Sequence, residues 1–313
     1  MITVIRYSVD KKQLWDDFIV DAKNSTFLFI RNYLDYHSDR FLDHSLMFYY
    51  DGVLIAVLPA SQHGNELQSH GGLTYGGLIM SVSCTVQLVI DIFTSLKTYC
   101  LENEIKSLLY KRVPYIYHKY PSDEDLYALF RLDANLIRRD IASTIFIPSM
   151  IRFSERRRRG CKRASKSGLI VKQSYDYENY ISILCDVLEK YHNSKPVHTS
   201  NELKMLAECF PKNIKLYSAF KDDVMLAGVV VYETETVAHA QYIANSDIGR
   251  KCGALDCVMD YLIHQIYKDK IFFDFGISTE DNGRYLNNGL ITQKQEFGGR
   301  GVAYDFYKIC IWK

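Results

Sequence analysis

The sequence predicts two consecutive α/β domains, each built on a mixed, mostly antiparallel sheet that splays at its centre and is flanked by helices. The chain has 313 residues, which is enough for two domains that each bury a core. Its composition, 48% hydrophobic and 24% charged, is that of a globular protein. The order of predicted helices and strands in the first half recurs in the second, at an offset of roughly 165 to 170 residues.

A β-hairpin is the clearest element of each half. In the first half, two apolar strands flank Asp51-Gly52, a dipeptide that tolerates the positive φ angles of a two-residue turn. In the second half, a Lys-Asp-Asp turn at 221–223 separates two similar strands. The predicted strands are residues 46–50 and 53–58 in the first half, and 215–220 and 224–232 in the second.

Two amphipathic helices precede each hairpin, and a strand, a helix, a strand, a helix and a final strand follow it. In the first half these elements are predicted at residues 12–22, 29–37, 67–79, 85–101, 107–112, 123–132 and 143–148. In the second half they are predicted at residues 177–191, 201–208, 237–244, 254–267, 271–275, 284–297 and 303–312. We therefore expect an N-terminal domain at 1–150 and a C-terminal domain at 169–313.

A strongly basic segment at 151–168 is predicted to form a helix that links the two domains. It contains a single acid, Glu155, among eight basic residues: Arg152, Arg156, Arg157, Arg158, Arg159, Lys162, Arg163 and Lys166. Guanidinium groups match phosphate oxygens, so this segment, with Arg156 as the candidate residue, could bind an anionic part of a substrate. The alternative is a solvated linker helix.

Charge and cysteine usage exclude several other classes of protein. With 38 Lys and Arg against 37 Asp and Glu, the net charge of +1 gives no overall field for nucleic acid or an anionic membrane. The longest apolar run, 86–96, is interrupted by Asp91, and the N-terminal segment lacks the pattern of a signal peptide. The eight cysteines are scattered without Cys/His pairing. We expect a cytoplasmic protein with free thiols, without a metal and without membrane insertion.

A glycine-containing turn at 246–254 leads from a predicted strand into a predicted helix and is a candidate phosphate site. Glycines allow a ligand to approach the backbone, and a helix start offers N–H groups and a partial positive charge. The turn matches neither a Walker loop nor a dinucleotide fingerprint, and plain entry into a helix is the alternative. The candidate donor-binding residues are Gly249, Arg250, Lys251, Gly253 and Ala254.

The same turn and a downstream block resemble a known superfamily. Arg250-Lys251-Cys252-Gly253-Ala254 is similar to the pyrophosphate-binding turn of GNAT acyltransferases, usually Gln/Arg-x-x-Gly-x-Gly/Ala. The segments at 272–278, 289–290 and 293–299 resemble the C-terminal signature of the Fem-type branch. That branch comprises tandem-GNAT proteins, including aminoacyl-tRNA-dependent peptidyltransferases of cell-wall synthesis and acyltransferases of polysaccharide loci. The latter are the most similar, and the resemblance implies two tandem GNAT-like domains.

The resemblance implies an acyltransferase that moves an acyl group from acyl-CoA, for example acetyl-CoA, to an amine or hydroxyl. The implied acceptor is a nucleotide-linked sugar or another glycan or cell-envelope precursor. One alternative is an aminoacyl-tRNA donor, with the arginines at 156–159 contacting RNA. Another is a non-catalytic glycan- or nucleotide-binding protein on a GNAT scaffold, because Leu255 departs from the family's donor turn.

Three residues are candidates for catalysis. Lys294 occupies the lysine of the Fem-type Phe-Lys-x-x-Phe-Gly motif, so the resemblance implies that it stabilises negative charge near the reacting carbonyl. Asp274 lies in a strand between phenylalanines, where an unpaired carboxylate is costly, so it either pairs with a cation or acts as a base. His239 lies on an alternating strand beside the donor turn and is a candidate to assist proton removal, or a core histidine.

Four further residues are candidates for binding the acceptor. Four glycines within 69–77 surround His70 and Tyr75, which indicates either a backbone that approaches a ligand or a tight turn. His198 lies in a loop before a predicted helix that Thr199 or the next serine would cap, and Tyr242 lies on the strand that carries His239.

Overall fold

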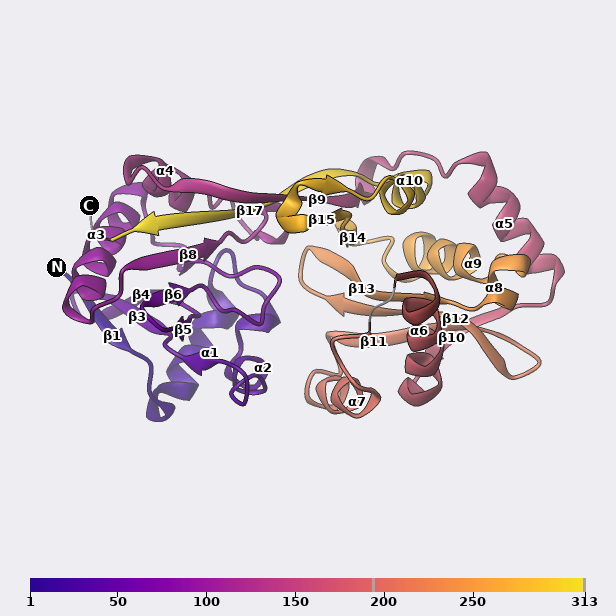
Figure 1. Ribbon diagram of the computed structural model, residues 1–313, viewed down its shortest axis with the longest axis horizontal. Helices are drawn as coiled ribbons and strands as arrows, with labels where there is room; N and C mark the ends of the chain where they lie inside the picture. The colour runs from indigo at the N-terminus through magenta and orange to yellow at the C-terminus, as the bar shows by residue number, and fades with distance from the viewer. Residues whose placement is uncertain (193–194, 312–313) are drawn as a thin grey trace. The chain divides into compact units, whose positions relative to one another are not determined.

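The computed structural model describes residues 1–192 and 195–311, and its contacts divide the chain into two compact units (Figure 1). Unit 1 comprises Met1–Asp140, Thr279–Tyr285 and the described residues from Ala303 onward. Unit 2 comprises Ile141–Ser278 and Leu286–Val302. Strands β9 (Asn135–Phe146) and β17 (Arg300–Cys310) therefore each contribute residues to both units.

One sheet of unit 1 is antiparallel and contains the predicted hairpin. Its strands are, in spatial order, β1 (Ile2–Arg6), β3 (Leu46–Tyr50), β4 (Val53–Leu58) and β7 (Ile79–Met80). At the turn between β3 and β4, Asp51 has φ 48° and Gly52 has φ 84°, which are the positive angles that the dipeptide predicts. The hairpin is therefore confirmed.

A second group of strands in unit 1 contains a parallel pair. The spatial order is β17, β8 (Ser107–Lys111), β6 (Glu66–Gln68), β5 (Ser61–His63) and β2 (Leu42–Asp43). Strands β6 and β8 run parallel, whereas the pairs β17–β8, β5–β6 and β2–β5 are antiparallel. The helices of unit 1 are α1 (Lys12–Asp21), α2 (Arg31–Asp35), α3 (Val86–Glu102) and α4 (Glu124–Arg131). The core of the unit includes Val89, Ile92, Phe93 and Leu96, one apolar face of α3.

The sheet of unit 2 separates at its centre. Its spatial order is β10 (Ile170–Ser174), β11 (Ile214–Lys221), β12 (Val224–Glu233), β13 (Val237–Asn245), β14 (Phe272–Ile277) and β9. Every neighbouring pair is antiparallel except β13 and β14. The parallel ladder of β13 and β14 runs from Val237 opposite Phe272 to His239 opposite Asp274, and both strands continue beyond it. The predicted splay is thus present at this point of the sheet.

Helices cover both faces of the unit 2 sheet. They are α5 (Glu155–Lys166), α6 (Tyr177–His192), α7 (Ser200–Cys209), α8 (Asp247–Cys252), α9 (Ala254–Tyr261) and α10 (Asn288–Glu296). Ala238, Ala240, Phe273 and Phe275 share a core with α9. On the other face, Tyr180 of α6 packs against Gly228. Within the described residues, no helix combines the length and the apolar character that crossing a membrane requires.

The two units differ from the predicted boundaries at 150 and 168. Residues 141–150 and α5 belong to unit 2, and the described residues from Ala303 onward belong to unit 1. The reason is long-range pairing: Phe306 of β17 lies opposite Lys111 of β8, so the last strand joins the first unit. The final predicted strand also included Trp312, which lies outside the described residues.

Helix α5 is part of unit 2 because it packs closely on α9. A Cβ atom at Gly160 would collide with the carboxylate of Asp256, and one at Gly253 would collide with the carbonyl oxygen of Gly160. Gly253 also has φ +83°, a left-handed conformation that favours glycine. Arg157 Nη1 lies 2.8 Å from Asp256 Oδ1, so an ion pair completes this helix crossing.

Candidate active site

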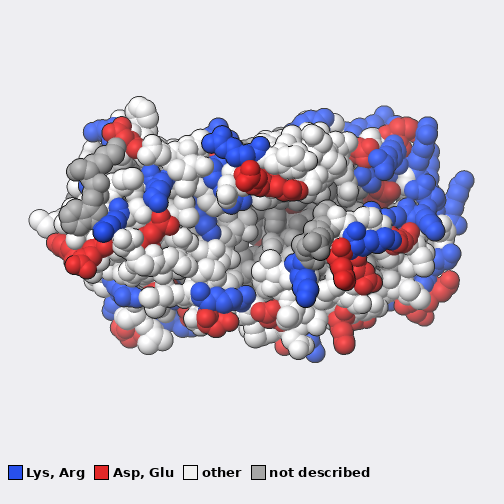
Figure 2. All heavy atoms as spheres, viewed as in Figure 1, with Lys and Arg blue, Asp and Glu red and all other residues white. Residues whose placement is uncertain are grey.

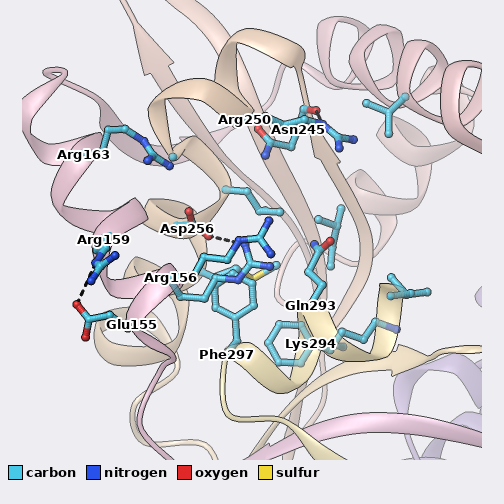
Figure 3. Close-up of a pocket in the computed structure, with 18 residues that line it drawn as sticks. Glu155, Arg156, Arg159, Arg163, Asn245, Arg250, Asp256, Gln293, Lys294 and Phe297 are labelled. Carbon is cyan, nitrogen blue, oxygen red and sulfur yellow. Dashed lines mark hydrogen bonds and ion pairs between the residues drawn. The ribbon is translucent and has the colours of Figure 1, made fainter. Parts of the chain in front are cut away.

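A cavity of about 550 Å³ lies in unit 2, beside the ends of β13 and β14 that extend past their ladder (Figure 3). Its walls come from α5 and α6, from the end of β13, from α8 and α9, from β14 and from α10. The lining residues are Glu155, Arg156, Arg157, Arg159, Arg163, Val187, Ile243, Asn245, Arg250, Gly253, Leu255, Asp256, Met259, Phe275, Leu290, Gln293, Lys294 and Phe297.

The lining of this cavity is strongly cationic. Its lining includes five arginines and Lys294 but only two acids, Glu155 and Asp256. Both acids already pair with arginines, Glu155 with Arg159 at 3.3 Å and Asp256 with Arg157 at 2.8 Å. The remaining positive charge suits an anionic ligand, and phosphate oxygens match the guanidinium fork.

The candidate donor turn has a different local structure from the predicted glycine loop. Residues 247–252 form the short helix α8, which Ser246 caps by accepting a hydrogen bond from Gly249 N at 3.0 Å. The N–H groups of Arg250 and Gly253 donate to the carbonyl oxygens of Ser246 and Gly249. The prediction that this turn presents free N–H groups is therefore wrong at these three positions.

Close packing requires glycine at positions 249 and 253 of the turn. A Cβ atom at Gly249 would collide with the side chain of Asn245 and with the carbonyl oxygen of Leu226, and one at Gly253 would collide with the carbonyl oxygen of Gly160 in α5. Of the five candidate donor-binding residues, Arg250 and Gly253 line the cavity, whereas Gly249, Lys251 and Ala254 do not. The N–H groups that helix geometry leaves without an intrahelical partner are those of the first turn of α9.

Lys294 is a buried lysine at one end of the cavity. Only 4% of the residue is exposed, and its Nζ donates to the carbonyl oxygens of Gly276 at 2.9 Å and Ile277 at 2.6 Å. An ammonium group has three donors, so one N–H remains for a ligand. Burial lowers the pKa of Lys294 to about 8, although the nearby charge of Asp274 raises it.

His239 and Asp274 form a hydrogen-bonded pair. The Asp274 carboxylate is fully buried, and its Oδ2 lies 2.8 Å from His239 Nδ1. Thr144 Oγ1 donates to its Oδ1 at 2.7 Å. Because an ionised carboxylate only accepts hydrogen bonds, Nδ1 is the ring nitrogen that donates to Asp274, and Nε2 is the ring nitrogen that remains for a ligand. The carboxylate therefore has two hydrogen-bond partners, and its predicted role, as the partner of a cation or as a base, stays a prediction.

Two of the three candidate catalytic residues, Lys294 and His239, lie beside Gly276, and the third, Asp274, is hydrogen-bonded to His239. Lys294 donates to the Gly276 carbonyl oxygen, and a Cβ atom at this glycine would lie 3.2 Å from His239 Cε1 and 3.9 Å from its Nε2. His239 alternates with alanines, and Asp274 with phenylalanines, that belong to the α9 core. Both side chains therefore face the opposite side of the sheet from the cavity, while Lys294 approaches from the α10 side.

His198 and Tyr242 contact each other in unit 2. His198 Nδ1 is hydrogen-bonded to the Tyr242 hydroxyl, and His198 is only 7% exposed. Thr199 caps α7 in a complete capping box with Glu202, as the sequence predicts. Neither His198 nor Tyr242 lines the cavity, and their role in binding an acceptor stays a prediction.

His70 and Tyr75 lie in the interior of unit 1, where they are 2% and 4% exposed. The glycines beside them are explained by packing, because Cβ atoms at positions 71 and 72 would collide with the ring of Phe41. Lys111 Nζ donates to the carbonyl oxygens of three loop residues, His70, Gly71 and Leu73. The tight-turn alternative accounts for this loop, and burial does not favour the predicted substrate contact.

Replacing His70 with Asn should reduce the acid dependence of stability. Burial lowers the pKa of His70 to about 3, against 6.5 for the ordinary side chain. As pH falls from about 6.5 toward 3, the unfolded chain binds a proton that the folded chain does not, so stability is lost. Between pH 7 and pH 5 this loss is about 2 kcal/mol.

Urea unfolding at both pH values would measure this loss in the wild type and in His70→Asn. Asparagine tolerates the left-handed backbone at this position, where φ is 47°. His63→Asn, at an exposed neighbouring histidine, should keep the wild-type dependence. An unchanged dependence in His70→Asn would exclude His70 as the cause.

Several cavity residues were not predicted individually from the sequence. Arg159 and Arg163 lie three and seven positions after Arg156, which is the spacing of one helix face, so the signal was present. Asn245 and Gln293 carried no comparable signal. In the described part of the chain, no group of three or more His, Cys, Asp or Glu side chains is placed to hold a metal ion.

Comparisons with known proteins give full-length structural similarity at low identity. No protein-family model and no curated protein matches the chain. FemX superposes with a TM-score of 0.67 at 10% identity, over 97% of this chain and 96% of that chain. The C-terminal domain of a putative lysylphosphatidylglycerol synthetase from Agrobacterium fabrum gives 0.62 at 10% identity, over 96% and 91%. A tandem GNAT protein from the clavulanic acid biosynthesis pathway gives 0.51 at 8% identity, over 100% and 99%.

Proposed function

We propose, starting from the tandem GNAT-like and Fem-like fold that these similarities show, that the chain is an acyltransferase with an acyl-CoA donor. The observation that carries the proposal is the unit 2 cavity, where an excess of arginines and a buried lysine meet beside the splayed strands. Arginines suit the phosphates of such a donor, and Lys294 suits the oxygen of its carbonyl group.

The donor side of the proposed site is the cavity. Arg250 and the first turn of α9 would bind the diphosphate, because guanidinium forks and N-terminal N–H groups both favour phosphate oxygens. The apolar residues Leu255, Met259 and Phe275 would contact the acyl and pantetheine parts. The free N–H of Lys294 would then donate to the thioester carbonyl oxygen.

In the proposed chemical step, His239 with Asp274 handles the proton and Lys294 stabilises the negative charge. The acceptor nitrogen or oxygen attacks the thioester carbon, and His239 Nε2 takes the proton that the acceptor loses. The carbonyl oxygen becomes an oxyanion, which Lys294 stabilises. The carbon–sulfur bond then breaks, and the CoA thiolate leaves and receives the proton from His239. Asp274 stabilises the protonated imidazole throughout.

The proposed acceptor is an amine or hydroxyl of a sugar-type molecule, as the resemblance to acyltransferases of polysaccharide loci implies. His198 and Tyr242 are proposed to contribute to its binding. Nucleotide-linked amino sugars are the first acceptors to test, because they combine a reactive amine with the predicted class.

The exposed cations of α5 favour a second donor class, aminoacyl-tRNA. Figure 2 shows Lys and Arg side chains gathered along the edge of unit 2 where α5 runs, and the side chains of Arg156 and Arg159 are 78% and 73% exposed. An aminoacyl group, however, carries an ammonium that needs an acidic partner. Among the described residues that line the cavity, both acids are already paired with arginines, which favours acyl-CoA.

The test is a turnover assay with the full chain, acetyl-CoA and a panel of nucleotide-linked amino sugars. The expected result is release of the CoA thiol together with an acetylated product detected by mass spectrometry. Calorimetric titration with acetyl-CoA gives the donor affinity independently of the acceptor. No binding of acetyl-CoA, combined with tight and salt-sensitive binding of tRNA, would replace the donor with aminoacyl-tRNA.

A further inference from the structure

Three arginines of α5 form a row along the cavity. Arg156, Arg159 and Arg163, here called the arginine row, are spaced i, i+3 and i+7, so they share one helix face, and all three line the cavity. The helix rises about 10 Å over this span, so the row extends along the cavity wall. In Figure 3, Arg163 lies on the opposite side of the cavity from Lys294, far from the proposed reacting end.

The charge of the arginine row is less fully neutralised by acidic side chains than the charge of the neighbouring Arg157. Arg157 pairs with Asp256 at 2.8 Å and with Glu296 at 2.9 Å, and its guanidinium lies 4.4 Å from the Phe297 ring centroid. Its interactions hold α5 against the rest of unit 2. In contrast, Arg163 forms no ion pair within the described residues, and Arg156 reaches its one acid, Glu296, only at 3.6 Å. Arg159 pairs with Glu155 at 3.3 Å, but it shares this one carboxylate with Arg158.

The cavity therefore has two cationic walls, which meet where Gly160 of α5 packs against Gly253. Arg250 and the start of α9 form one, and the arginine row forms the other. A thioester of phosphopantetheine on a carrier protein has a single phosphodiester, which one wall would satisfy. CoA has a diphosphate and, in addition, a 3′-phosphate monoester, whose charge is near −2 at neutral pH and which offers three acceptor oxygens.

We infer that the arginine row binds the 3′-phosphate of the donor, so that the protein selects CoA thioesters over carrier-bound and 3′-dephosphorylated ones. The inference rests on the proposed function, because it assigns a second phosphate site in the same cavity. Binding of this phosphate would explain why α5 carries arginines on the face that lines the cavity, which the alternative of a solvated linker helix does not explain.

Calorimetric titration of the full chain with CoA and with 3′-dephospho-CoA tests this inference. The wild type should bind CoA about tenfold to a hundredfold more tightly, the gain that charge-assisted hydrogen bonds to a phosphate provide. In the double variant Arg159→Met/Arg163→Met the two affinities should become equal, and 3′-dephospho-CoA should bind as it does to the wild type. Arg158→Met, on the same helix but outside the cavity lining, is the matched control and should keep the discrimination.

Each outcome bears on a different claim. Equal wild-type affinities for the two nucleotides would overturn the inference and leave the proposed donor in place. The same conclusion would follow if the double variant kept the discrimination, or if it lost affinity for both nucleotides equally. Binding of neither nucleotide by the wild type would overturn the acyl-CoA donor itself. Thermal unfolding of each variant checks that α5 remains folded.

Discussion

Lys294→Met should lower kcat by about 10² to 10³-fold, with little change in the affinity for acetyl-CoA. The substitution keeps the unbranched side chain, one atom shorter, and removes the ammonium that would face the oxyanion. The remaining cations of the cavity still bind the donor phosphates, so the loss should affect the chemical step. Steady-state kinetics together with calorimetric titration separate the two effects.

The pH dependence of the rate distinguishes two roles of Lys294, a charged ammonium that stabilises the oxyanion and a neutral amine that accepts a proton. With a pKa of about 8, Lys294 is mostly charged at pH 7 and loses its charge as pH rises through 8. If the charged form of Lys294 stabilises the oxyanion, the rate of the wild type should fall above pH 8. The pH–rate profile of Lys294→Met should not show this fall. A rate that instead rises through pH 8 would show that the neutral amine acts as a base.

Lys270 offers a matched control for the structural part of this effect. Its Nζ also donates to two backbone carbonyl oxygens, those of Thr234 and Glu235, it lies 3.3 Å from Glu233 Oε1, and it does not line the cavity. Lys270→Met should lower thermal stability to a similar degree and leave kcat unchanged. If both lysine variants lose activity in proportion to stability, Lys294 has a structural role alone.

His239→Gln should lower kcat by about 10² to 10⁴-fold, the range for loss of a general base. The hydrogen bond from Nδ1 to Asp274 fixes the orientation of the ring. Because residue 276 is a glycine without a side chain, the Cε1–Nε2 edge of the ring stays uncrowded. Calorimetric titration with acetyl-CoA should show an unchanged donor affinity, because His239 does not line the cavity that binds the donor. Unchanged kcat in a folded variant would exclude His239 as the base.

If Asp274 acts through its hydrogen bond to His239, the effects of the two substitutions should not add. Asp274→Asn should lower kcat, and the double variant with His239→Gln should be no slower than His239→Gln alone. His264 provides the control, since its Nδ1 also lies 3.0 Å from a carboxylate oxygen, that of Asp260, outside the cavity lining. His264→Gln should retain full activity.

Local signals in the sequence predicted most of the secondary structure. The Asp51-Gly52 hairpin and the Thr199 capping box depend on residues at most a few positions apart, so both could be predicted from the chain alone. The duplicated order of elements gave the fold class, which the full-length similarity to tandem GNAT structures confirms. The helix-face spacing of the α5 arginines also lay in the sequence.

What the sequence by itself determined is therefore the element order, the class of the fold and the residues that could carry chemistry. Only the tertiary structure decided that His239 and Lys294 lie beside Gly276 with Asp274 bonded to His239, that α5 packs on α9 through Gly160, and that His70 is buried. Turns and caps depend on neighbours in the chain. Sheet membership, helix crossings and burial depend on contacts between residues far apart, which no short stretch of sequence encodes.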